Sequence, residues 1–288
     1  MDFATRLKEK RPNLSASSLK TYDSLLRSLA KAISTEDFAK NVPKVLDHVA
    51  SKPMSSKKTI LSALFVLTGK PEFQEAMKKG IKDYTEHTSK QEMTQKQKDN
   101  FLSGEELAAM FNGMTEEIKG LLKLKTFSPA NLARIQQYVM LALYSGVYIP
   151  PRRAQDYTEF KISNVDKAKD NYFDGKQLVF NTYKTAKNYG QQTVEVPKEL
   201  AALLKRWIAI NPTDFLFFDV NRAKLDNVQL NQRLNRLVGK KSFGVNGFRH
   251  SYMTTKYGKT IEEDTEMAKD FEDMGSSMAQ QKVYIQKK

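Results

Sequence analysis

Residues 177–197, QLVFNTYKTAKNYGQQTVEVP, carry the clearest β-type pattern in this chain of 288 residues. Two β-type stretches, 177–186 and 191–197, lie on either side of KNYG at 187–190, where the glycine suits a turn. The pattern predicts an antiparallel hairpin with Lys184 near its turn. Alternatively, a lysine at such a turn only protects the edge of a sheet from pairing.

The segments on both sides of this hairpin have helical periodicity. Ser103 and Glu106 occupy the positions of a capping box, and Ser128–Pro129 opens a strongly apolar helix that closes near Gly146. After the hairpin, helical patterns resume at KELAALLKRWIAI (198–210), NVQLNQRLNRLV (227–238), FRHSYMTTKYG (248–258) and TEMAKDFEDMG (265–275). We therefore expect residues 101–288 to form one mainly helical domain with a small antiparallel sheet.

The first part of the chain, residues 1–88, is expected to form a separate helical domain. One helix is predicted by apolar residues at helical spacing behind serines suited to capping: Leu19, Tyr22, Leu26, Leu29 and Ile33. Another is expected to open at Ser55 and Ser56 and to stop at Gly69, and a third to begin at Pro71. Residues 89–100 are polar and rich in Gln and Lys, which predicts a linker between the two domains.

The strong positive charge indicates a polyanionic partner. The chain has 47 Lys and Arg against 33 Asp and Glu, a formal charge of +14, which favours phosphate contacts and counterion release. We expect Lys57 and Lys58 to lie in the first turn of a helix, where backbone N–H groups and two cations could hold a phosphate; the alternative is a solvated helix end. Lys96 and Lys98 make the linker basic enough to cross a DNA backbone.

Several classes of site are excluded or disfavoured by composition. The absence of cysteine excludes disulfides, zinc–thiolate sites and cysteine nucleophiles. The three histidines, His48, His87 and His250, share no metal-binding spacing, so we expect no metal and no cofactor. There is no phosphate-binding GxxxxGK[ST] loop. No apolar run approaches the ~18 residues of a membrane span and no secretory signal is visible, so we expect an intracellular protein, cytoplasmic or nuclear.

Three more stretches contain side chains that suit phosphate chemistry. PPRRAQDYTEFKISNVD (150–166) places Arg153 three residues before Asp156, NGFRHSY (246–252) places Arg249 near a helix start, and QQKVYIQKK (280–288) contains Tyr284. Taken singly, each has a plainer explanation: a surface ion pair, a solvated helix face and an exposed aromatic. Their order along the chain, together with Lys184, is what favours a functional site over these plainer explanations.

In this order and context the sequence resembles the tyrosine recombinase and integrase family of phages, mobile elements and large DNA viruses. The resemblance covers most of the chain. It identifies Arg153, followed by acids at plus three (Asp156) and plus thirteen (Asp166), as the first catalytic arginine. It implies three further catalytic residues, Lys184, Arg249 and Tyr284, a helical core-binding domain at 1–88 and an α+β catalytic domain at 101–288.

Two positions depart from the family pattern. Asn246 stands where the second arginine box normally begins with histidine, and Ser276 follows Gly275 where histidine or tryptophan is usual. Asparagine can donate a hydrogen bond to a phosphate oxygen but cannot shuttle protons near neutral pH. His250 could substitute for the missing histidine, or have only a core or surface role. For Asp156, holding its helix or orienting Arg153 is favoured over a chemical role.

The resemblance implies a site-specific recombinase or integrase. Tyr284 would attack a DNA phosphodiester and form a 3′-phosphotyrosyl intermediate, with neither metal nor ATP, on double-stranded DNA bound by a homo-oligomer, a dimer or a tetramer. One alternative is a type IB topoisomerase-like enzyme, which relaxes DNA with the same residues. The other is a catalytically weak DNA-binding protein with a recombinase fold, for which Asn246 and Ser276 are the support.

Overall fold

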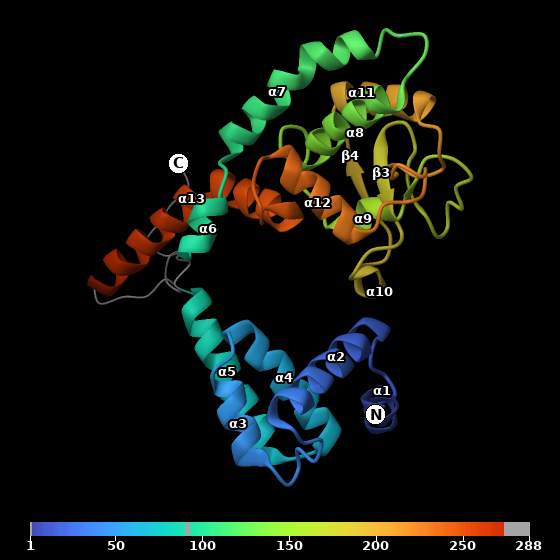
Figure 1. Ribbon diagram of the computed structural model, residues 1–288. Helices are drawn as coiled ribbons and strands as arrows, with labels where there is room; N and C mark the ends of the chain where they lie inside the picture. Colours follow the sequence, from blue (N-terminus) through green and yellow to red (C-terminus); the bar gives the residue numbers. More distant parts are fainter. Residues whose placement is uncertain (1, 90–92, 274–288) are drawn as a thin grey trace. The chain divides into compact units, whose positions relative to one another are not determined.

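The computed structural model describes residues 2–89 and 93–273 (Figure 1). The chain divides into two compact units, Met1–Met93 and Thr94–Lys288, each with its own hydrophobic core. The division falls inside the stretch expected to be a linker, and residues 95–100 of that stretch form a short helix.

The described part of the N-terminal unit is helical. Its elements are α1 (Phe3–Lys10), α2 (Ala16–Ile33), α3 (Val42–Ala50), α4 (Met54–Thr68) and α5 (Pro71–Ser89). Ser15 caps α2 by accepting a hydrogen bond from the Ser18 amide at 3.1 Å. The predicted apolar face of α2 is confirmed: Leu26, Leu29 and Ile33 are buried, and Leu19 and Tyr22 pack partly buried against the core.

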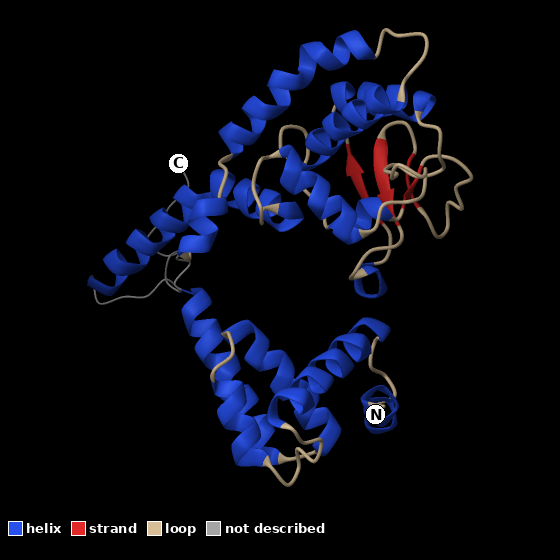
Figure 2. Cartoon of the chain, in the orientation of Figure 1, coloured by secondary structure: helices blue, strands red, loops and turns tan. Residues whose placement is uncertain are grey.

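The second unit combines helices with one small sheet (Figure 2). Its helices are α6 (Gln95–Asn100), α7 (Gly104–Leu121), α8 (Pro129–Tyr144), α9 (Ala154–Thr158), α10 (Ala186–Tyr189), α11 (Lys198–Ile210), α12 (Asn227–Leu237) and α13 (Gly244–Asp273). The predicted capping box of α7 is present, with Ser103 and Glu106 each bonded to the other's backbone N–H. Ser128 caps α8 with Pro129 in its first turn, also as predicted.

The sheet is mixed, so the prediction of a purely antiparallel sheet was wrong. Its strands are β1 (Phe160–Lys161), β2 (Asn171–Phe173), β3 (Gln177–Phe180) and β4 (Gln192–Glu195), in the order β1-β2-β3-β4. The β2–β3 and β3–β4 pairs are antiparallel, but β1 pairs with β2 in parallel. A strand as short as β1 gives no readable alternation, because the period-2 signal needs at least four residues.

The connection between β3 and β4 is longer than the predicted turn. The antiparallel hairpin itself is confirmed, with Phe180 opposite Gln192, but the first strand ends at Phe180 and not at residue 186 as predicted. The residues expected to turn, 187–190, instead continue the helical turn α10 and end at Gly190, whose φ of +65° places it in the region that favours glycine.

A single long helix forms the end of the described chain. The helical pattern at 248–258 and the described part of the pattern at 265–275, up to Asp273, belong to one helix, α13, which runs through Gly258 without a break. A glycine inside a helix costs about 1 kcal/mol relative to alanine, which a long helix can tolerate.

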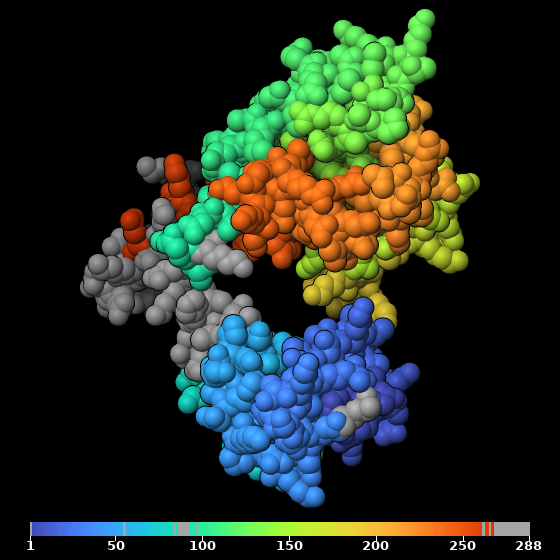
Figure 3. All heavy atoms as spheres, viewed as in Figure 1, coloured from blue at the N-terminus to red at the C-terminus, as the bar shows by residue number. Residues whose placement is uncertain are grey.

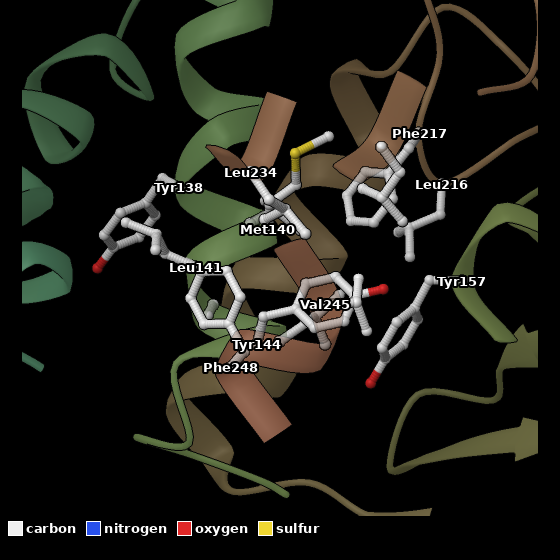
Figure 4. Close-up of a cluster of buried hydrophobic side chains, with 14 of the residues drawn as sticks. Tyr138, Met140, Leu141, Tyr144, Tyr157, Leu216, Phe217, Leu234, Val245 and Phe248 are labelled. Carbon is white, nitrogen blue, oxygen red and sulfur yellow. The ribbon is translucent and has the colours of Figure 1, made fainter. Parts of the chain in front are cut away.

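The core of the second unit joins α8, α9 and α13 (Figure 4). The Tyr144 ring of α8 lies edge-on to Tyr157 of α9, with ring centroids 5.3 Å apart, and 5.9 Å from the Phe248 ring of α13. These contacts fix α9 against the first turns of α13. Within residues 2–89 and 93–273, none of the helices is both long and apolar enough to cross a bilayer.

Candidate active site

Arg153 is presented to solvent at the start of α9. It is the N-cap residue of this helix, with extended backbone (φ −69°, ψ 157°), and its side chain is exposed. Within the described part of the chain, its guanidinium makes no hydrogen bond or ion pair. An exposed cation without a protein partner is available to bind a phosphate.

Arg152, the residue before it, has the opposite environment. Its Nε donates to Asp156 Oδ2 at 2.8 Å, and its Nη2 donates to Gln192 Oε1 at 3.0 Å. Its guanidinium carbon lies 3.9 Å from the centroid of the Phe180 ring, and only 17% of its side chain is exposed. The partner of Asp156 is thus Arg152, four residues before it, and not Arg153 as the expected spacing suggested.

The carboxyl group of Asp156 is buried and is affected by the charges of three arginines. Burial raises the pKa of its carboxyl group, and the positive charges of Arg152, Arg153 and Arg249 act against that shift. The last of these arginines comes from α13, far away in the sequence. Two of the predicted catalytic residues, Arg153 and Arg249, thus both act electrostatically on one carboxyl group. Oδ1 of Asp156 has no hydrogen-bond partner among the described residues.

Arg249 is oriented by the way α13 begins. Two asparagines of α12 cap its first turn: Asn235 Oδ1 accepts from the Gly244 amide at 2.7 Å, and Asn231 Oδ1 accepts from the Val245 amide at 2.8 Å. The residue before Arg249, Phe248, is fully buried. Arg249 is half-buried, and within residues 93–273 its side chain makes no hydrogen bond or ion pair.

Asn246 and His250 are both exposed on the same helix. Asn246 precedes Arg249 by three residues, so the two share one side of α13. Asn246 is thus the better placed of the two to meet a phosphate bound by Arg249.

Lys184 lies on the hairpin, between β3 and α10, with its side chain exposed. In the space-filling view the hairpin tip (yellow) stands out at the edge of the second unit (Figure 3). The base of the hairpin is held by the buried side chain of Asn171. Its Nδ2 donates to the carbonyls of Asp156, at 2.9 Å, and Thr182, at 2.7 Å, and its Oδ1 accepts from the Asn181 and Thr182 amides. Asn171 therefore connects the hairpin that carries Lys184 to the helix that begins with Arg153.

Arg152, Asn171 and Gln192 are contributors that sequence reasoning missed. The only signal for Arg152 was the adjacent pair of arginines, and spacings of three and four residues both allow a helical ion pair with Asp156. Asn171 and Gln192 are polar residues in β stretches, and nothing in their local sequence indicates their partners.

Two buried tyrosines lie beside this cluster. Burial raises the pKa of both Tyr144 and Tyr157, and the charge of Asp156 raises each further. Neither hydroxyl has a hydrogen-bond partner among the described residues, and neither ring is accessible. They are therefore unsuited to attack a phosphate.

Some predicted residues lie outside what the structure describes. These are Tyr284, Ser276 and the side chain of Lys96, although Lys96 itself belongs to α6. Lys98 is exposed on α6, and Lys58 is exposed on α4.

Lys57 and Lys58 were expected in the first turn of a helix, but they are the fourth and fifth residues of α4. Helix α4 begins at Met54, so Lys57 is its fourth residue, and its amide already donates to the Pro53 carbonyl at 3.0 Å. These two lysines can offer a phosphate only their side chains.

No cluster of three or more His, Cys, Asp or Glu side chains suited to a metal ion occurs among the residues the structure describes. Comparison of the chain with protein-family models found no match, and comparison with curated proteins found none either.

Proposed function

We propose that this protein cleaves and rejoins DNA strands through a 3′-phosphotyrosyl intermediate, as a site-specific recombinase or integrase. The observation that supports the proposal is that the charges of Arg153 and Arg249, which are distant in the sequence, both act on the buried carboxyl group of Asp156. Both guanidiniums make no hydrogen bond or ion pair among the described residues, and both act electrostatically on one buried carboxyl group. Such an arrangement suits a phosphodiester, because each guanidinium presents a planar fork to two oxygens and is always charged.

In the proposed reaction, the phenol oxygen of Tyr284 attacks the phosphorus of a DNA phosphodiester. A phosphorus–oxygen bond to the tyrosine forms, and the bond to the 5′-oxygen breaks. Arg153 and Arg249 stabilise the negative charge that develops on the two non-bridging oxygens. The covalent link retains the energy of the phosphodiester, so a 5′-hydroxyl can rejoin the strand by the reverse step.

Two protons must move in this step. The departing 5′-oxygen is a poor leaving group, and Lys184 supplies its proton as general acid. The proton of the tyrosine hydroxyl needs an acceptor, and Asn246 cannot serve, since an amide does not titrate near neutral pH. We assign that proton to water, with Asn246 donating a hydrogen bond to a phosphate oxygen.

Double-stranded DNA is the proposed partner, bound by a dimer or tetramer of the chain. The charge of +14 supplies affinity through phosphate contacts and counterion release. Lys58 and Lys98, both exposed, are candidates for such contacts, along with Lys57. Phosphate contacts fix the position of the DNA, and sequence choice requires further contacts to base edges.

The experiment that tests the proposal is covalent capture in EDTA. Labelled duplexes, including DNA that flanks the protein's own gene, are incubated with the protein, denatured and separated on a gel. We expect a DNA-linked band that Tyr284→Phe abolishes without changing DNA affinity. Arg153→Ala and Arg249→Ala should each remove most of the band, because one preorganised donor is worth about 3–4 kcal/mol in a transition state.

A non-catalytic DNA-binding protein is the second candidate, and the observation that favours it is Asn246. Tight binding with no covalent band on any duplex would establish it, and Asn246→His would then be the first change to test for gained cleavage. If a band does form, relaxation of any supercoiled plasmid without site dependence would instead indicate topoisomerase-like activity.

A further inference from the structure

We propose that Arg152 is a positioning residue that holds the Lys184 hairpin in place relative to Arg153. This inference rests on the proposed function, because it concerns how the general acid reaches the same phosphate as the arginine. Arg152 itself contacts protein groups on all sides and is not assigned any contact with DNA.

The contacts of Arg152 join α9 to both strands of the hairpin. On α9, its Nε binds Asp156 Oδ2. On β4, Gln192 Oε1 accepts from its Nη2, and on β3 the Phe180 ring stacks beneath its guanidinium at 3.9 Å. The Tyr183 ring, next to Lys184 in the chain, lies 5.5 Å from the same guanidinium carbon. One planar cation is thus surrounded by four partners, and no other residue type has that shape and charge.

The side chain of Asn171 provides a second connection between α9 and the hairpin. Asn171 joins the Asp156 carbonyl to Asn181 and Thr182 through its fully hydrogen-bonded side chain. Asn171 fixes the backbone where β3 ends, whereas Arg152 fixes the hairpin's side chains and its second strand. Further side-chain bonds hold the hairpin: the Tyr183 hydroxyl donates to the Gly190 carbonyl at 2.7 Å, and Gln191 Nε2 donates to Asn181 Oδ1 at 2.8 Å.

Holding the hairpin in place matters for one step of the proposed reaction, the protonation of the leaving 5′-oxygen by Lys184. A general acid must stand within hydrogen-bond reach of the leaving oxygen, and a displacement of about 1 Å can cost ~100-fold in rate. Arg153 is fixed to the start of α9, so a change in Arg152 should move Lys184 relative to Arg153. The resulting defect should therefore be a defect in protonating the leaving group.

The test uses Arg152→Lys in the full chain and two DNA substrates. One is an ordinary duplex; the other carries sulfur in place of the 5′-bridging oxygen at the cleaved bond. A thiolate leaves without a proton, so this substrate does not need the general acid. We expect Arg152→Lys to slow single-turnover cleavage of the ordinary duplex by about tenfold or more, and to cleave the sulfur substrate within about threefold of the parent. Lys184→Ala should behave alike, whereas Arg153→Ala should be slow on both substrates.

Two further variants separate positioning from folding. Gln192→Leu removes only the hydrogen bond to β4, and should show the same selective defect to a smaller degree. Arg134→Lys, which alters a surface pair with Glu117 in the same unit, should cleave both substrates like the parent. An equal loss on both substrates, or no loss in Arg152→Lys, would overturn the inference. Failure of the parent protein to form a covalent complex with either substrate would instead remove the proposed function.

Discussion

Arg152 and Arg153 are adjacent in the chain, yet only Arg152 pairs with Asp156, while Arg153 is exposed to solvent. The Nε–Oδ2 distance between Arg152 and Asp156 is 2.8 Å, and only 2% of the Asp156 side chain is exposed. Arg152 thus has a structural role, whereas Arg153, which has no ion-pair partner among the described residues, is available to a ligand.

This division predicts that two alanine substitutions differ strongly in their effect on stability. Arg152→Ala leaves Asp156 buried without its partner, and breaking a buried pair in this way costs about 3 kcal/mol. Arg153→Ala removes an exposed side chain, so its free energy of unfolding should stay within ~0.5 kcal/mol of the parent. Urea unfolding at neutral pH measures both. Equal stability of the two variants would contradict the division of roles.

Stability should also depend on the ionisation of Asp156. Burial raises the pKa of this carboxyl group above the value of 3.8 expected without burial. The protonated form therefore favours the folded state, and this contribution is lost as pH rises from 3.8 through the folded-state pKa.

The comparison that isolates this group is Asp156→Asn, which cannot titrate. The unfolding free energy of the asparagine variant minus that of the parent should increase with pH in this window and then level off. Urea unfolding over a series of pH values measures it. A difference that stays constant or decreases with pH would show that the three arginines outweigh burial.

The start of α13 should tolerate no side chain at Gly244. Its φ is +49°, and an added Cβ would lie 2.4 Å from Asn231 Oδ1, the atom that caps the helix. We expect Gly244→Ala to lower the unfolding free energy by at least ~1 kcal/mol. Gly113→Ala on α7 is the matched control, since nothing lies within 4 Å of its added Cβ. That substitution should stabilise the protein by up to about 1 kcal/mol, because alanine is the better helix former. If Gly244→Ala and Gly113→Ala change the thermal unfolding temperature by similar amounts, backbone strain at Gly244 is excluded.

Lys57→Ala should weaken DNA binding without affecting the fold. Its side chain, and not its amide, is available to a phosphate. Because a phosphate contact does not read the base sequence, the loss of affinity should be the same for every DNA sequence. The slope of log K against log salt should fall by about one unit. Filter binding at several salt concentrations measures this slope. Lys40→Ala, an exposed lysine of the same unit paired with Asp37, serves as the control. A slope unchanged from the parent's would exclude a phosphate contact at Lys57.

The sequence by itself determined where several helices begin or end. Ser103 with Glu106, Ser128 with Pro129, and Gly69 all act on backbone groups within a few residues of themselves, so their effect is readable locally. The two strands of the hairpin, β3 and β4, were readable for the same reason, since alternation is a local property, whereas the helical turn α10 between them was not predicted.

The tertiary structure decided which side chains meet. Arg152 and Arg153 lie four and three residues before Asp156, and both spacings allow a helical ion pair. The stack of Arg152 on Phe180 and its bond to Gln192 select it as the partner. The two-residue strand β1 likewise depends on segments that are distant in sequence, because it pairs with β2 and bridges to Phe215. These choices depend on groups that are distant in sequence and adjacent in space, and their energies arise only once the core of α8, α9 and α13 has packed.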